Sequence, residues 1–143
     1  MKTVAAHAIC VAARRSGDKN DSEEYNCVIV PANTDLPYEF EERFAPVDPH
    51  QTSVVAKIVQ GEPDQPSKDA AVLRKITVPI QPSDKHADRI KLKGRYTEEG
   101  LLETVFIDEL LGKPVSDSFV HSAGLSKAEI SSKREQLSTE MER

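Results

Sequence analysis

Residues 43–62 read RFAPVDPHQTSVVAKIVQGE and contain the end of one strand, a turn with two prolines, and a second strand that ends at Gly61. The second strand is apolar on both faces of its pleat: one face carries Val54, Ala56 and Ile58, and the other carries Val55 and Val59. One face can cover a core, because successive side chains of a strand point to opposite sides. The contact made by the other apolar face is not explained by a core on one side alone.

Short β-compatible runs separated by turn-forming residues recur along the rest of the chain. They are residues 3–13, 25–31, 38–44, 71–80, 89–96, 101–108 and 115–120. Residues 38–44 and 89–96 alternate apolar with charged side chains, which is typical of strands with one face toward a core and the other toward solvent. The sequence therefore predicts a mainly β protein, an antiparallel β-sandwich of about eight strands.

The pattern changes at the C-terminus, where Ser126 and Glu129 form an S-x-x-E capping box. Leu125 and Ile130 stand on either side at the spacing of a hydrophobic staple. An α-helix is therefore predicted to follow the sandwich, with the boundary between the two parts at residues 121 and 122. The predicted organisation is a β-sandwich over residues 1–121 and a helical segment over residues 122–143.

Composition restricts the class of protein. The chain has 143 residues, of which 38% are apolar and 30% charged, as in one ordinary globular domain. The formal net charge is −5, so the summed field repels nucleic acid and anionic lipid. No run of sequence approaches the roughly 20 apolar residues of a membrane-spanning helix. We therefore expect a cytoplasmic protein whose partners include neither nucleic acid nor membrane.

Cysteine usage points to the same compartment. Cys10 and Cys27 lie in apolar, strand-like runs and are interpreted as buried free thiols in a reducing environment. Residues 1–15, MKTVAAHAICVAARR, share with secretory signals a lysine before an apolar run. His7 interrupts that run and two arginines follow it, which favours a buried first strand.

The run NTDLPYEFEERFAPVDPHQTSVVAKIVQGE, residues 33–62, resembles the β-sandwich substrate-binding domain of the seventy-kilodalton heat-shock chaperone (DnaK) family. The family pattern is N-T-x-[IL]-P, a strand that ends in Phe, a short loop, then N-Q-[ST]-x-V and Q-G-E. The positions that match without a gap are Asn33, Thr34, Leu36, Pro37, Phe44, Gln51, Thr52, Val54, Gln60, Gly61 and Glu62. Residues 89–114 are similar to two paired strands of the family, and residues 122–130 are similar to the entry into its first lid helix.

This resemblance implies a domain that holds short, extended, apolar segments of unfolded polypeptides in a loop-framed pocket. Phe44, Val54 and Ala56 match positions that line the central hydrophobic pocket of the family. Val47 matches an arch residue that closes over the bound backbone, and Val11 matches a further pocket position on the first strand. Recognition through one apolar side chain and a hydrogen-bonded backbone tolerates many client sequences.

The same interpretation has further consequences. Val55 and Val59 are expected to pack within the sandwich, while Val54 and Ala56 face the client. Ala56 is smaller than the aliphatic residue usual in the family, and charged residues 12–24 replace a short glycine-containing loop that carries the other half of the arch.

The family couples this domain to a nucleotide-binding domain. The resemblance therefore implies that this chain is a fragment, with a truncated lid at residues 122–143. ATP, J-domain co-chaperones and nucleotide-exchange factors would act through the full-length protein. The chain itself is expected to hold no cofactor or metal and to have no enzymatic activity.

Three other interpretations remain open. The pocket residues could be ordinary sandwich core, since apolar strand residues usually are. An enzyme would have to recruit His7, Cys10, Cys27, His50, His86 or His121, which show neither a CxxC pair nor closely spaced histidines. The alternative function is a structural β-sandwich that mediates protein–protein contacts without binding extended peptides.

A basic row formed by Arg89, Lys91, Lys93 and Arg95 could meet an acidic partner. A solvated strand face is the commoner cause of such a pattern. Glu39, Glu41 and Glu42 supply a nearby complement of opposite sign.

Overall fold

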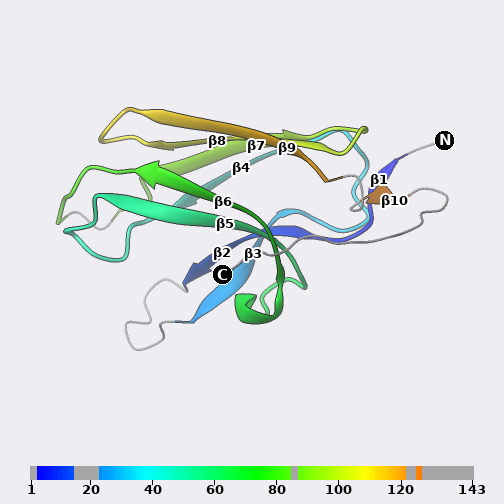
Figure 1. Ribbon diagram of the computed structural model, residues 1–143, viewed down its shortest axis with the longest axis horizontal. Coiled ribbons are helices and arrows are strands. Elements are labelled where there is room, and N and C mark those ends of the chain that lie inside the picture. Colours follow the sequence, from blue (N-terminus) through cyan, green and yellow to red (C-terminus); the bar gives the residue numbers. More distant parts are fainter. Residues whose placement is uncertain (1–2, 15–22, 85–86, 122–124, 127–143) are drawn as a thin grey trace.

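Two four-stranded antiparallel sheets face each other in the computed structural model, which describes residues 3–14, 23–84, 87–121 and 125–126 (Figure 1). The first sheet has the strand order β3-β2-β5-β6, formed by β3 Glu24–Val30, β2 Ile9–Arg14, β5 Ser53–Gln60 and β6 Ala71–Pro79. The second has the order β4-β7-β8-β9, formed by β4 Tyr38–Phe44, β7 Ile90–Tyr96, β8 Leu101–Asp108 and β9 Pro114–Val120. The mainly β fold with two antiparallel sheets is confirmed.

The predicted first strand over residues 3–13 is divided in two. β1, Val4–Ala5, pairs with β10, Leu125–Ser126, and residues 6–8 separate it from β2. Ala5 also exchanges main-chain hydrogen bonds with the turn before β4. Its amide donates to the Thr34 carbonyl at 3.0 Å, and its carbonyl accepts from the Asn33 amide at 2.6 Å. The N-terminal run therefore leaves the large sheet because another turn supplies its hydrogen bonds.

One short helix lies between β5 and β6, the 3-10 turn η1 at Ser67–Asp69. The helix predicted after Ser126, like His86, lies outside the described residues. None of the helices in the described part of the chain has the length and apolarity needed to cross a membrane.

Both sheets contribute to one main core. Its fully covered side chains include Ile9, Ile58 and Val78 from the first sheet and Leu92, Leu102, Tyr96 and Phe106 from the second. Each aliphatic side chain of this kind stabilises the fold by roughly 1.5 to 3 kcal/mol through burial. The alternation predicted for residues 38–44 and for the strand from Ile90 is confirmed, because their apolar residues face this core.

The two faces of β5 differ from the expectation. Val54, Ala56 and Ile58 face the main core. Val55, expected inside the sandwich, is 50% exposed on the outer face, so that expectation is wrong. Val59 is buried, but in a second cluster on the outer face with Ala8, Cys10 and Val72. The apolar outer face of β5 is thus covered only at its C-terminal end.

The basic row is confirmed only within β7. Lys93 and Arg95 are exposed, and Lys91 lies 3.7 Å from a Glu41 carboxylate oxygen of the neighbouring strand. Arg89 was expected to point outward with them, but only 6% of its surface is accessible. Strand alternation does not reach Arg89, because β7 begins at Ile90.

Strand ends gather at one end of the sandwich, at the left of Figure 1. β2, β4, β6 and β8 end there, and β3, β5, β7 and β9 begin there. We call this the loop end.

Candidate functional site

The expected binding residues come from both sheets and one connection. Phe44 is the last residue of β4, opposite Ile90 of β7. The other four are placed as follows: Val54 and Ala56 near the start of β5, Val47 in the β4–β5 connection, and Val11 within β2 opposite Ile58. Phe44, Val47 and Val54 thus belong to the loop end.

Accessibility divides these residues into two groups. Val47 is 54% exposed, whereas Phe44 and Val54 are half-buried against the main core. Ala56 and Val11 are only 7% and 3% exposed and belong to that core. The protein thus offers three of the five side chains to solvent, and the other two lie beneath the surface.

Two side chains, Gln51 and Asp48, organise the turn at residues 45–52. The Gln51 Oε1 atom accepts hydrogen bonds from the main-chain amides of Val47 at 2.8 Å and Asp48 at 2.7 Å. The Asp48 carboxylate accepts a further bond from the His50 amide at 2.8 Å. Such local side-chain to backbone bonds fix a turn that has no strand partner. They hold the main chain beneath Val47 while its side chain remains exposed.

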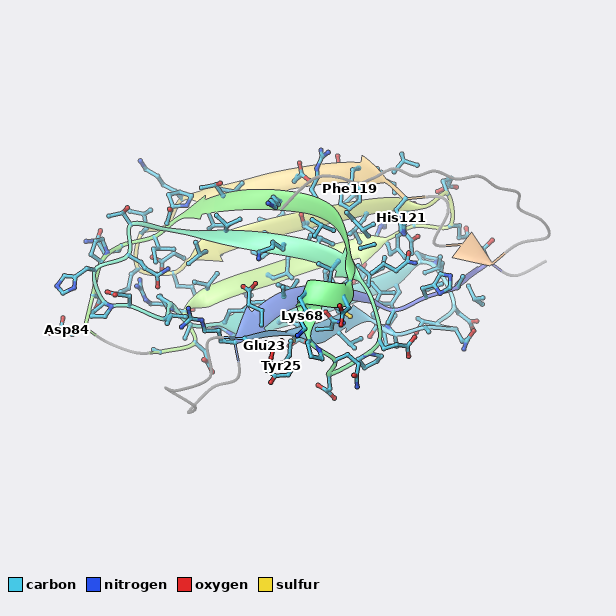
Figure 2. All side chains as sticks on the ribbon, turned by 60° about the horizontal axis from the view of Figure 1, so that its bottom comes forward. Glu23, Tyr25, Lys68, Asp84, Phe119 and His121 are labelled. Atoms are coloured by element: carbon cyan, nitrogen blue, oxygen red, sulfur yellow. The ribbon has the colours of Figure 1, made fainter. Side chains whose placement is uncertain are left out.

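The β6–β7 connection lies directly beside this turn. The Ile80 amide donates to the Thr52 carbonyl at 3.0 Å, and the Ser83 amide donates to the Pro49 carbonyl at 2.9 Å. Figure 2 shows Asp84 of the same connection at the loop end, well separated from His121 at the opposite end. The turn that carries Val47 is therefore supported from outside by a second loop.

A buried ion pair anchors that second loop. Arg89 and Asp108 approach to 2.7 Å, with side chains 7% and 0% exposed. Sequence reasoning missed this pair, because Arg89 was assigned to the outer basic row. A partial signal existed: Asp108 continues the inward alternation of Leu102, Thr104 and Phe106 along β8, and a buried carboxylate needs a cation or several donors.

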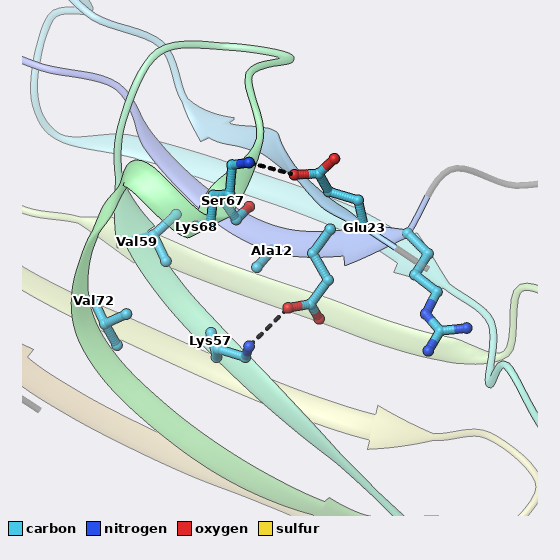
Figure 3. A pocket seen from close by; sticks show the side chains of 9 residues that line it. Ala12, Glu23, Lys57, Val59, Ser67, Lys68 and Val72 are labelled. Atoms are coloured by element: carbon cyan, nitrogen blue, oxygen red, sulfur yellow. Dashed lines mark hydrogen bonds and ion pairs between the residues drawn. The ribbon is translucent and has the colours of Figure 1, made fainter. Parts of the chain in front are cut away.

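A hollow of about 420 Å³ lies elsewhere, on the outer face of the first sheet (Figure 3). It is lined by Ala12, Arg14, Glu23, Glu24, Lys57, Val59, Ser67, Lys68 and Val72. Ion pairs cross its rim, from Lys57 to Glu24 at 2.7 Å and from Lys68 to Glu23 at 3.7 Å. It contains none of the expected binding residues.

The two thiols and the His121 imidazole are poorly suited to chemistry. Burial raises the pKa of Cys10 to about 12, and burial also raises the pKa of Cys27. Burial, with a smaller contribution from His7, lowers the pKa of His121 to about 4. The described residues contain no group of three His, Cys, Asp or Glu side chains placed to hold a metal ion. The expected lack of enzymatic activity stays a prediction.

Comparison with known proteins finds a similarity to a chaperone. The chain is 28% identical over 102 residues to the chaperone protein DnaK of Thermoplasma acidophilum. The aligned region covers 71% of this chain but only 17% of that relative. A search against protein-family models finds no match. The sheet-rich fold and this similarity together fit a DnaK-like substrate-binding domain in outline.

Proposed function

We propose that the loop end holds short, extended, apolar segments of unfolded polypeptides, as the substrate-binding part of a DnaK-like chaperone. The observation that carries this proposal is the similarity to a DnaK chaperone. It is supported by accessible apolar side chains at the loop end. The exposed Val47 lies on the connection between the partly accessible Phe44 and Val54.

In this proposal a client binds in two ways. Its main chain forms hydrogen bonds to the turn at residues 45–52, and one apolar side chain packs against Phe44, Val47 and Val54. Burying a Leu-sized side chain contributes roughly 1.5 to 3 kcal/mol, so binding to this domain alone is weak to moderate. Contact with Ala56 and Val11 requires the core to open at the loop end, because both are covered in the empty domain.

The test is fluorescence anisotropy with a labelled, Leu-rich heptapeptide. The expected result is saturable binding by the wild type and at least about tenfold weaker binding by Val54→Asp and by Phe44→Ala, a loss of ~1.4 kcal/mol. Val55→Asp is the matched control, since it introduces the same charge one residue away on the outer face. If the wild type binds no better than folded Val54→Asp and Phe44→Ala, the proposal is wrong.

In a longer protein that also carries a nucleotide-binding domain, we propose that ATP controls client release. J-domain co-chaperones and nucleotide-exchange factors are then partners of that longer protein. The chain described here needs no cofactor for the holding step itself.

The competing proposal is a sandwich that contacts other folded proteins without taking up extended peptides. Val105 and Val120, exposed on β8 and β9, are the side chains that favour it. Under this alternative, the heptapeptide does not bind at the loop end, and a folded partner protects Val105 and Val120 instead.

A further inference from the structure

We propose that the buried ion pair of Arg89 and Asp108 positions the turn at residues 45–52 for peptide holding. The inference rests on the proposed function, and it names the residues outside the binding surface that keep that surface in place. Neither residue belongs to the expected binding residues; both act through the intervening main chain of residues 80–83.

The ion pair forms hydrogen bonds to the main chain of Gln81. Arg89 Nη1 donates to both carboxylate oxygens of Asp108, at 2.8 and 2.7 Å. Arg89 Nη2 donates to the Gln81 carbonyl at 2.7 Å, and the Gln81 amide donates to Asp108 Oδ2 at 2.7 Å. Both polar groups of one peptide residue are thus satisfied by the two charged side chains, which fixes the start of the β6–β7 connection.

The next link leads from Gln81 to the turn. Its neighbour Ile80 donates to the Thr52 carbonyl at 3.0 Å, and Ser83 donates to the Pro49 carbonyl at 2.9 Å. These two bonds attach to the turn at residues 45–52 at its middle, Pro49, and at its end, Thr52. A displacement of Gln81 is therefore transmitted to the turn through Ile80 and Ser83.

Desolvation offsets much of the attraction in a buried ion pair, and well-packed apolar residues often stabilise a fold as well or better. An apolar pair cannot bond to the Gln81 amide and carbonyl. The pair is therefore better explained by the loop geometry that it specifies than by the stability it adds.

The test separates positioning from stability. Arg89→Met/Asp108→Leu replaces the pair by apolar side chains, and Arg89→Lys keeps a cation but loses the second nitrogen, Nη2, that donates to the Gln81 carbonyl. Arg43→Met is the matched control, because it removes an exposed ion pair to Glu109, also 2.7 Å long, at the same end. Urea unfolding, heptapeptide dissociation and amide exchange at Ile80 and Ser83 are measured for each.

We expect the double variant to unfold at a urea midpoint near that of the wild type and to release the heptapeptide about tenfold faster, equivalent to ~1.4 kcal/mol. The rate of heptapeptide release from Arg89→Lys is expected to lie between those of the wild type and the double variant. The rate for Arg43→Met is expected to match that of the wild type. Amide exchange at Ile80 and Ser83 should quicken in the double variant, while exchange at Phe106 stays unchanged.

Exchange separates the two possible failures. If exchange at Ile80 and Ser83 is unchanged in both the double variant and Arg89→Lys, the positioning role is wrong, whatever the peptide does. If exchange quickens but no variant, nor the wild type, binds the heptapeptide, the proposed function fails while the support of the turn stands. Unchanged peptide release despite faster exchange overturns the link between the turn and holding.

Discussion

Phe40 and Gly94 are paired across β4 and β7, and the Phe40 ring occupies the space that a side chain at residue 94 would need. A Cβ placed on Gly94 would lie 2.7 Å from Cε1 of that ring and would also meet the Glu103 carbonyl. Gly94→Ala is therefore expected to destabilise the protein by about 1 to 3 kcal/mol through overpacking. Urea unfolding should show a lower midpoint with an unchanged slope.

Strand propensity alone predicts the opposite sign, since glycine weakens a strand. Lys93→Ala is the matched control: it changes the adjacent, exposed residue and should shift the free energy of unfolding by less than about 0.5 kcal/mol. A Gly94→Ala protein as stable as the wild type would show that the ring can move aside at little cost.

Arg74 links the two sheets at the edge formed by β6 and β9. Its guanidinium donates to both carboxylate oxygens of Asp117, at 2.9 and 3.2 Å, and lies 5.1 Å from the ring centroid of Phe119. Because Arg74 is half-exposed, Arg74→Met is expected to cost only about 1 kcal/mol. A double-mutant cycle with Asp117→Asn should assign roughly half of this loss of stability to the ion pair. The ion-pair contribution should become smaller in 0.5 M salt.

Arg95→Met provides the comparison, because Arg95 pairs with Glu103 at 3.6 Å within a single sheet. Its free energy of unfolding should change by less than about 0.5 kcal/mol. If Arg74→Met and Arg95→Met lower the free energy of unfolding equally, the contact between the sheets contributes no more stability than an ordinary surface ion pair.

Strands with a local alternating pattern could be predicted closely from the sequence. β4 and β8 have the expected bounds, because each shows its inward and outward residues without reference to the rest of the chain. The first strand could not be predicted in this way. Its division depends on main-chain hydrogen bonds between Ala5 and the turn at Asn33 and Thr34, a long-range contact that a run of apolar residues does not reveal.

The candidate site shows the same limit. Resemblance to a family supplied positions but not exposures, so Phe44 and Val54 are accessible while Val11 and Ala56 are covered. The support from Arg89 was missed because its partner lies on another strand. The roles of these candidate residues and of Arg89 in peptide holding stay predictions.

His121 should make stability depend on pH. Burial lowers its folded pKa to about 4, whereas the unfolded side chain titrates near 6.5. Between these two pKa values the unfolded chain binds more protons than the folded protein. The stability that His121 contributes is therefore complete above pH 6.5 and is lost as pH falls toward 4. The loss is at most roughly 3 kcal/mol, at about 1.4 per pKa unit.

Urea unfolding between pH 5 and 7.5 measures this dependence. His121→Gln should flatten the slope of the free energy of unfolding against pH. Parallel slopes in the wild type and His121→Gln would place the pH dependence in other groups.

Cys10 should be inert while the protein is folded. Burial raises the pKa of its thiol to about 12, so at pH 8 only ~1 thiol in 10,000 is ionised. In a Cys27→Ser variant, reaction with Ellman's reagent should therefore follow the population unfolded by urea. Rapid labelling in the absence of urea would contradict the burial of Cys10.

Gln51 should control the turn that carries Val47 without controlling the fold. Its Oε1 atom accepts from two main-chain amides in an exposed loop, and each such bond contributes about 0.5 to 1.5 kcal/mol. Gln51→Ala should speed amide exchange at Val47 and Asp48 and weaken heptapeptide binding, while the urea midpoint moves little. Gln51→Glu replaces the amide oxygen by a carboxylate oxygen that still accepts hydrogen bonds, and it should preserve slow exchange at both amides. Equal exchange in the alanine and glutamate variants would show that the turn is held by its flanking strands and not by the Gln51 side chain.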